Sequence, residues 1–331
     1  MRKLVVSEYL QDKYLDLLRA GFDVEYDPDM YSDRPRLLKS AADAEAIFIR
    51  NRTRIDGEFL ASAKVMKMVG RLGVGLDNID MNACSERGIE VIPAVGANAV
   101  SVAEYVMGAM LVLMRGVYGM TGSMVGGEWP RQGHAFGREV MGKTLGLVGF
   151  GSIARHVADR ARAFEMRIVA HDPFIHESDP VWQTATPLSL EELLRVADVI
   201  SLHTPLNPET RNLIDGRALA LMKPTAVLIN TSRGGTVDEG AVADALRRGA
   251  MGGAALDVFV SEPLGPDPAS TFAGVPNLLL TPHVAGNTHE SVDRVARMIV
   301  TEVLEVLRSG GPPSRGDNRI VPSEAGGSAG N

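Results

Sequence analysis

Short apolar runs alternate with segments of helical period along most of the chain. Residues 3–6, 145–148 and 199–202 have the length and apolar content of buried strands, and apolar side chains recur at helical spacing between such runs. This alternation is typical of βαβ units, in which helices join parallel strands and cover both faces of the sheet. We therefore expect an α/β fold with parallel sheets. A length of 331 residues is enough for two such domains.

Local signals predict where some of the connecting helices begin and end. Ser189 and Glu192 have the spacing of a capping box, in which each side chain accepts a hydrogen bond from the other residue's backbone. Asp238 is suited to cap a helix that continues to Arg248, and Gly249 supplies a C-terminal stop.

Charge and cysteine content narrow the functional class. The chain has 34 Lys and Arg against 41 Asp and Glu, a net charge of −7 that argues against binding nucleic acid. A single cysteine, Cys84, excludes a disulfide framework and a Cys-based zinc site, so we expect a cytoplasmic protein without a metal. Glu104 and Arg115 interrupt the most apolar stretch, 102–118, which favours a core or subunit-interface helix over a membrane span.

A glycine-rich segment, GFGSIA, follows one of the strand-like runs and matches the pattern G-x-G-x-x-A. Gly149 permits a tight turn, Gly151 lets the backbone approach a pyrophosphate, and Ala154 is small enough for close helix–strand packing. Ser152 and Ile153 would begin a helix whose N-terminal N–H groups face the phosphates. The pattern predicts a dinucleotide site, although an ordinary βα turn would give the same residues.

An acidic residue at the end of the next strand supports the dinucleotide interpretation. Asp172 follows the apolar run 168–170 and lies 21 residues after Gly151. A carboxylate there accepts hydrogen bonds from ribose hydroxyls and repels a 2′-phosphate, and residues 173–175 contain no arginine to bind that phosphate. We therefore expect NAD in preference to NADP.

Three later strand-like runs each end in a loop with one charged or titratable residue. These residues are Arg233, Glu262 and His283. Oxidising a hydroxyl with a nicotinamide needs a base for the hydroxyl proton and a cation for an anionic substrate, and a carboxylate beside the base raises its basicity. The three residues supply that set. Each alone also has a structural explanation. Arg233 could cap a helix, Glu262 could lie in a surface turn, and His283 could be an exposed histidine.

These motifs resemble those of the D-isomer-specific 2-hydroxyacid dehydrogenases, over roughly residues 40–310. The resemblance implies that Arg233 binds the substrate carboxylate, that His283 is the acid/base and that Glu262 is its partner. It also implies two Rossmann-like or flavodoxin-like domains with the active site in the cleft between them. The similar formate dehydrogenases carry a glutamine in place of this glutamate, which favours a hydroxy acid.

The same resemblance assigns roles along the chain. Residues 1–98 with 287–309 would bind the substrate, and residues 99–286 would bind NAD. Residues 310–331 are polar and glycine-rich without periodicity, and we expect a disordered tail. The apolar helix expected at 101–120 would then form a homodimer interface.

Further cofactor contacts follow from the resemblance. Asp257 matches a position that supports the nicotinamide end, and His203, Thr204 and Pro205 match a loop that lines the cofactor pocket. The residues that we assign to the NAD site are Gly149, Gly151, Ser152, Ile153, Asp172, His203, Thr204, Pro205, Thr231, Ser232, Asp257, His283 and Gly286.

The expected substrate-binding segments, 71–80 and 98–104, most resemble those of 3-phosphoglycerate dehydrogenases. The resemblance implies that backbone at Gly73, Val74 and Gly75 meets the substrate carboxylate. We therefore expect hydride transfer between NAD and a 2-hydroxy acid, or its 2-oxo acid, that carries a second anionic group. Phosphoglycerate is the first candidate. Nearby we also assign Asn98 to the substrate site.

The segment RNRTR contains three arginines at alternate positions. Alternation along an extended segment would point Arg50, Arg52 and Arg54 the same way, and grouped guanidiniums bind phosphate or sulfonate bidentately. By resemblance, phosphoglycerate dehydrogenases carry an arginine at the position of Arg50 but a small residue at that of Arg52. The extra charge makes sulfolactate a competing substrate. The alternative is a solvated strand end, which we favour for Arg54.

A function of a different class stays open. Some members of this fold are NAD-sensing transcriptional corepressors, whose output is partner binding in place of turnover. Such proteins can keep the set Arg233, Glu262 and His283, so that set does not decide between the two classes.

Overall fold

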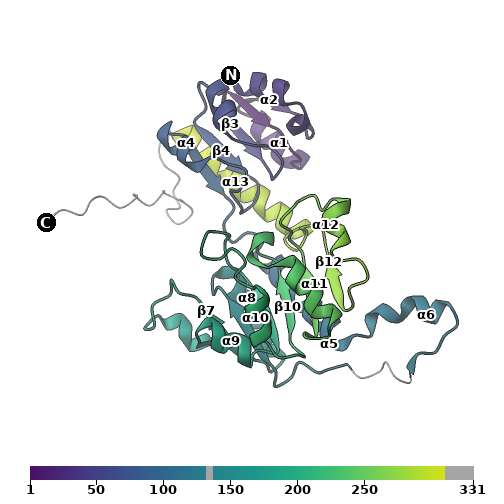
Figure 1. Ribbon diagram of the computed structural model, residues 1–331. Coiled ribbons are helices and arrows are strands. Elements are labelled where there is room, and N and C mark those ends of the chain that lie inside the picture. The colour runs from purple at the N-terminus through teal and green to yellow at the C-terminus, as the bar shows by residue number, and fades with distance from the viewer. Residues whose placement is uncertain (132–136, 310–331) are drawn as a thin grey trace. The chain divides into compact units, whose positions relative to one another are not determined.

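The computed structural model describes residues 1–131 and 137–309, which form two compact units (Figure 1). Unit 1 consists of residues 1–98 and the C-terminal segment from Thr288, and unit 2 consists of residues 99–287. Each unit is built on its own parallel sheet flanked by helices. The expected α/β class with two parallel-sheet domains is therefore confirmed.

Unit 1 contains a five-stranded sheet in the order β2-β1-β3-β4-β5, with every pair parallel. This is the flavodoxin-like strand order. The strands are β1 (Lys3–Val6), β2 (Asp23–Tyr26), β3 (Ala44–Ile49), β4 (Met68–Arg71) and β5 (Glu90–Pro93). The helices are α1 (Asp12–Arg19), α2 (Arg34–Ala41), α3 (Gly57–Ser62), α4 (Met81–Glu86) and α13 (His289–Ser309).

Both faces of this sheet are buried, each by its own set of helices. From β1, Leu4 and Val6 pack in the core that includes α1 and α13, whereas Val5 packs with α2, α3 and α4. On α13, Ile299 and Val303 are fully buried in the same core as Leu4. The end of the chain that the structure describes thus returns to the N-terminal unit, while residues 310–331, the expected tail, lie outside the described residues.

Unit 2 contains a seven-stranded parallel sheet in the order β12-β11-β10-β9-β6-β7-β8. Counted from its first strand, six of these follow the Rossmann order 3-2-1-4-5-6, and one strand is added at the edge. The strands are β6 (Thr144–Val148), β7 (Arg167–His171), β8 (Thr186–Pro187), β9 (Val199–Leu202), β10 (Val227–Asn230), β11 (Gly253–Leu256) and β12 (Leu278–Leu280). The helices are α5 (Ala99–Arg115), α6 (Thr121–Val125), α8 (Ser152–Ala163), α9 (Leu190–Val196), α10 (Gly216–Leu221), α11 (Glu239–Arg247) and α12 (Pro266–Ser270).

The predicted helix caps of unit 2 are confirmed. Ser189 and Glu192 form the capping box at the start of α9. Asp238 caps α11 by accepting a hydrogen bond from the backbone of Ala241. Gly249 follows this helix in the left-handed conformation (φ +64°) and ends it.

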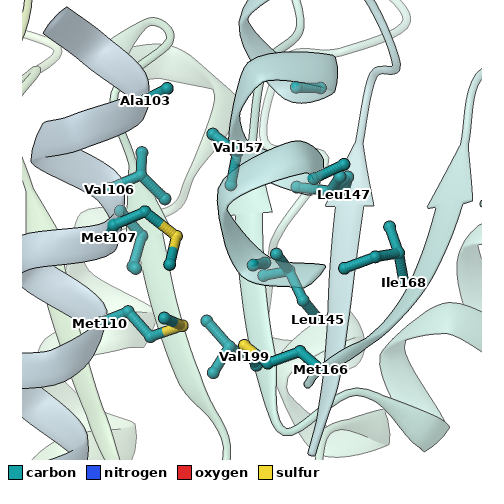
Figure 2. Close-up of a cluster of buried hydrophobic side chains, with 14 of the residues drawn as sticks. Ala103, Val106, Met107, Met110, Leu145, Leu147, Val157, Met166, Ile168 and Val199 are labelled. Carbon is teal, nitrogen blue, oxygen red and sulfur yellow. The ribbon is translucent and has the colours of Figure 1, made fainter. Parts of the chain in front are cut away.

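The apolar face of α5 belongs to the core of unit 2 (Figure 2). Ala103, Val106 and Met110 lie on the side of α5 that faces the sheet, in one cluster with Leu147 of β6 and Val157 of α8. This burial explains why such an apolar helix is compatible with a folded, solvated domain.

The structure differs from the expected helix over 101–120 in its bounds, while the homodimer interface expected in this region stays a prediction. Helix α5 ends at Arg115 because Gly116 adopts the left-handed conformation (φ +64°). Its apolar face packs inside its own unit. The exposed apolar side chains lie further along, on the extension that carries α6 and projects from the sheet of its unit (Figure 1), and include Tyr118, Met124 and Val125.

In the part of the chain that the structure describes, no single helix is long and apolar enough to cross a membrane. Only the bent pair formed by α5 and 118–125 reaches the length and composition of a span, and α5 is mostly buried in the core.

Candidate functional site

The glycine-rich loop connects β6 to α8 and leaves open space at the start of the helix. Gly149 has φ +85°, and a Cβ there would lie 2.7 Å from the carbonyl oxygen of His203, so only glycine fits without strain. Gly151 caps α8, and a Cβ there would meet no atom within 4 Å. Ala154 is fully buried where α8 packs on the sheet. The backbone at the start of α8 therefore has open space beside it at Gly151, as an anion site at a helix N-terminus requires.

Asp172 lies beside this loop, at the end of β7. Its Oδ2 accepts a hydrogen bond from the backbone N–H of Phe150 at 2.9 Å, and its Oδ1 accepts one from that of Phe174 at 3.0 Å. The carboxylate is thus fixed next to the glycine turn, where the sequence predicts a partner for the adenosine ribose.

Two hydroxyls at neighbouring strand ends are buried without a hydrogen-bond partner among the described residues. They are the Oγ1 atoms of Thr204, which follows β9, and Thr231, which follows β10. A buried polar atom without a partner is costly, so both positions fit a ligand with donors and acceptors, such as NAD. His203 precedes Thr204, and burial lowers its pKa to about 3, which keeps its imidazole neutral.

Not every residue assigned to the NAD site has a free side chain. The hydroxyl of Ser232 donates to Oδ1 of Asn230 at 2.7 Å and so stabilises its own loop. Pro205, Ser152 and Ile153 lie at the surface or half-buried. Contact of these residues with NAD, and that of Gly286, remains a prediction.

His283 and Glu262 form a hydrogen-bonded pair. Nδ1 of His283 lies 2.7 Å from Oε2 of Glu262, and Oε1 of Glu262 accepts a hydrogen bond from the backbone of Phe259 at 2.9 Å. The bond to Glu262 raises the pKa of His283, against the lowering effect of burial. Burial favours the neutral form of Glu262, but its hydrogen bonds with His283 and Phe259 lower its pKa overall.

The positive charge of Arg233 acts on both members of this pair. Arg233 follows β10, and its charge acts to lower the pKa values of both Glu262 and His283. The next residue, Gly234, lies against the loop that carries Glu262, because a Cβ there would come within 1.9 Å of the carbonyl carbon of Phe259. Unit 2 thus brings together the cation, the base and the carboxylate that the sequence singled out at three separate strand ends.

Asp257 shapes the loop that carries His283. It is 1% exposed, and its carboxylate accepts hydrogen bonds from the backbone of Val284 and Ala285, both at 2.9 Å. Its carbonyl oxygen accepts one from the backbone of His283 at 2.8 Å. The nicotinamide contact implied by the resemblance stays a prediction, and the visible role of Asp257 is to order this loop.

In unit 1, loop 73–75 rests on a buried arginine that sequence reasoning missed. Arg71 closes β4, and its Nε donates to the carbonyl oxygen of Gly75 at 2.8 Å. A Cβ at Gly73 would lie 2.3 Å from Nη1 of Arg71, so glycine leaves room for the guanidinium. A charged residue directly after a buried apolar run was the available signal. Val74 and Asn98 are half-buried.

The expectation that residues 50–54 are extended was wrong. β3 ends at Ile49, and residues 51–53 form a bend. The buried carboxylate of Glu8 holds this bend by accepting hydrogen bonds from the backbone of Arg50 (2.7 Å), Arg52 (3.2 Å) and Thr53 (3.0 Å). Strand alternation therefore does not set the direction of these arginines.

Arg52 is held instead by an aromatic ring. Its guanidinium carbon lies 5.0 Å from the ring centroid of Tyr31, and its Nη1 donates to the hydroxyl of that tyrosine. Arg54 is exposed. Within the described residues, no group of three or more His, Cys, Asp or Glu side chains is arranged to hold a metal ion.

Sequence comparison places these features among known enzymes. The model of the family described as D-isomer specific 2-hydroxyacid dehydrogenase, NAD binding domain, matches residues 107–285. The (S)-sulfolactate dehydrogenase of Chromohalobacter salexigens is 50% identical over 93% of this chain and 99% of its own length. The D-3-phosphoglycerate dehydrogenase of Methanocaldococcus jannaschii is 37% identical over 93% of this chain, which spans 58% of that longer protein.

Solved structures agree with these matches. The TT0316 protein of Thermus thermophilus has a TM-score of 0.86 and 37% identity, over 96% of this chain and all of that one. The D-lactate dehydrogenase of Aquifex aeolicus, complexed with NAD and lactic acid, has a TM-score of 0.82 and 28% identity, over 93% of this chain and 96% of that one.

Proposed function

The chain belongs to the D-isomer-specific 2-hydroxyacid dehydrogenases, NAD-dependent oxidoreductases that act on CH–OH groups, and we propose that its substrate is (S)-sulfolactate. The observation that carries this proposal is the end-to-end match, at 50% identity, with an (S)-sulfolactate dehydrogenase. The phosphoglycerate dehydrogenase from Methanocaldococcus jannaschii matches this chain through 58% of its length.

The stereochemical label is consistent with the family. The sulfonate-bearing carbon of sulfolactate outranks the carboxyl carbon, because sulfur precedes oxygen in the priority rules. In lactate the carboxyl carbon has the higher priority. The (S) form of sulfolactate therefore has the same spatial arrangement as a D-2-hydroxy acid, and one site geometry serves both.

The proposed mechanism starts from the hydrogen bond of the catalytic pair. Because Nδ1 of His283 donates to Glu262, Nε2 is left to accept the substrate hydroxyl proton. Glu262 stabilises the imidazolium that forms. When bound, NAD supplies the acceptor for the hydride from C2. In the reverse direction His283 starts protonated and returns the proton to the oxo oxygen.

We assign substrate binding to residues of both units. Arg233 and the loop 73–75 would hold the carboxylate, with Asn98 nearby, while Arg50 and Arg52 would bind the distal sulfonate. In this proposal, residues 1–98 with 287–309 bind the substrate and residues 99–286 bind NAD.

3-Phosphoglycerate, the first candidate from the sequence, is the second candidate here. It also carries a carboxylate and a distal anion, and the segments 71–80 and 98–104 favour it. We further propose a cytoplasmic homodimer, supported by the exposed apolar side chains of the extension 116–129.

A substrate panel tests the proposed function. The purified protein with NAD is assayed for NADH formation on (S)-sulfolactate, 3-phosphoglycerate, D-glycerate and D-lactate. We expect the highest kcat/KM with sulfolactate. Activity confined to the monoanionic acids would contradict the role of Arg50 and Arg52, and tight NADH binding without turnover on any acid would favour the corepressor class.

A further inference from the structure

A chain of hydrogen bonds in unit 2 runs from α5 to the carboxylate that orders the His283 loop. The hydroxyl of Tyr105 lies 2.6 Å from Oγ1 of Thr281, and Thr281 donates to Oδ1 of Asp257 at 2.6 Å. Since the single hydroxyl proton of Thr281 goes to Asp257, Tyr105 must be the donor in the first bond. The direction of the chain is therefore fixed, with every proton pointing toward the carboxylate.

The far end of this chain reaches the backbone of the acid/base residue. Asp257 accepts hydrogen bonds from Val284 and Ala285 with its side chain and from His283 with its carbonyl oxygen. His283 has φ +55°, a left-handed conformation that a non-glycine residue keeps only when its surroundings hold it. Asp257 contributes to that hold, together with the carbonyl oxygen of Thr281, which also accepts from the His283 backbone at 3.0 Å.

The near end is anchored in the core. Ala103, Val106 and Met107, which flank Tyr105 on α5, are buried in the cluster of Figure 2, so this part of the helix cannot rotate freely. Burial raises the pKa of Tyr105, so its hydroxyl remains a donor at neutral and moderately alkaline pH.

We propose that Tyr105 is a positioning residue for His283, acting through Thr281 and Asp257. It touches neither substrate nor cofactor in this scheme. Its hydroxyl fixes the orientation of the Thr281 hydroxyl, which fixes the carboxylate of Asp257 and hence the loop at 283–285. The proposal rests on the assignment of His283 as the acid/base in the proposed function.

The test compares Tyr105→Phe and Thr281→Val with a matched control. Tyr14→Phe also removes a half-buried phenol hydroxyl, which donates to Asp293 at 3.0 Å, but Tyr14 lies in unit 1, away from this chain of bonds. We expect Tyr105→Phe and Thr281→Val each to lower kcat by about three- to tenfold, the effect of losing one ordinary hydrogen bond. Thr281→Ser keeps the hydroxyl and should retain activity.

Two further readouts separate positioning from general destabilisation. The double variant Tyr105→Phe/Thr281→Val should have the kcat of Thr281→Val alone, because both changes break one chain. Equal loss of kcat in Tyr14→Phe, or multiplied losses in the double variant, would overturn the proposal.

Amide hydrogen exchange at Val284 and Ala285 tests the bonds without turnover. It should become faster in Tyr105→Phe and stay unchanged in Tyr14→Phe, and unchanged exchange in Tyr105→Phe would overturn the proposal. The two proposals can fail separately. If the protein oxidises no hydroxy acid but exchange is still faster in Tyr105→Phe, the proposed function is rejected and the positioning of the 283–285 loop by Tyr105 is kept.

Discussion

In the proposed mechanism, the hydrogen bond between His283 and Glu262 sets the pH at which each direction of the reaction can run. Oxidation of the hydroxy acid needs the neutral imidazole, so its rate rises as pH increases through the pKa of His283. Reduction of the oxo acid needs the imidazolium, so its rate falls through the same pKa. Because Glu262 raises this pKa, the protonated form needed for reduction persists to higher pH than in a free histidine.

Replacing Glu262 by glutamine should therefore shift both pH limbs to lower values. The amide keeps a hydrogen-bond acceptor beside Nδ1 but removes the charge that stabilises the imidazolium, so kcat should also fall by at least about tenfold. The measurement is kcat/KM against pH in both directions. A limb that stays in place or moves to higher pH would show that Glu262 does not control this proton.

In the proposed function, Arg52 binds the distal anion, so the choice of a doubly anionic substrate depends on it. Replacing it by leucine should raise KM for sulfolactate by about tenfold or more while leaving KM for D-lactate nearly unchanged, because only the former has a distal anion to lose. Arg54→Leu is the matched control, since Arg54 lies exposed in the same loop. Similar KM values for sulfolactate in the two variants would remove Arg52 from the substrate site.

The loop between β6 and α8 contains two glycines with different roles, Gly149 in the turn and Gly151 at the start of the helix. Gly149→Ala places a Cβ against the backbone of His203 at positive φ, and it should destabilise the fold by about 1–3 kcal/mol. Gly151→Ala meets no protein atom and should leave the melting temperature unchanged, yet weaken NAD binding about tenfold or more by filling the space for the pyrophosphate. Thermal unfolding and NADH titration of both variants check this, and equal NADH affinity in Gly151→Ala would place the phosphates elsewhere.

Local patterns predicted the elements that are buried and the caps that are formed by neighbours in sequence. The run 199–202 is a strand with the expected bounds, and Asp238 caps its helix. The edge strand β2 was missed because its side chains are exposed or half-buried and show no apolar run. The bend after Ile49 was missed because Glu8, more than 40 residues away, sets its shape.

Some residues of the candidate site could be predicted from local patterns and others could not. Arg233, Glu262 and His283 could be found because each follows a strand-like run, and parallel strands bring such ends to one edge of the sheet. The chain from Tyr105 to Asp257 depends on contacts between distant segments, which no local pattern encodes. Arg71 contacts a loop only four residues away and was missed although it ends a buried apolar run.

For the whole molecule, the proposed homodimer would use the exposed apolar side chains after α5 as its interface. Val125 is 84% exposed and Trp129 is 74% exposed, more than an isolated domain normally leaves on one extension. Val125→Asp should shift a dimer toward monomer in sedimentation equilibrium, whereas Val65→Asp, on an exposed position of unit 1, should not. A dimer that withstands the first change would place the interface elsewhere.

The two enantiomers of sulfolactate provide the most direct test of the account. In the proposed function, a hydroxy acid of D-type arrangement with a distal anion gives its hydride to NAD and its proton to His283. The measurement is the initial rate of NADH formation by the purified protein with each enantiomer and NAD. We predict turnover of (S)-sulfolactate and almost none of (R)-sulfolactate; a preference for the (R) form, or no turnover of either while 3-phosphoglycerate is oxidised, would contradict the account.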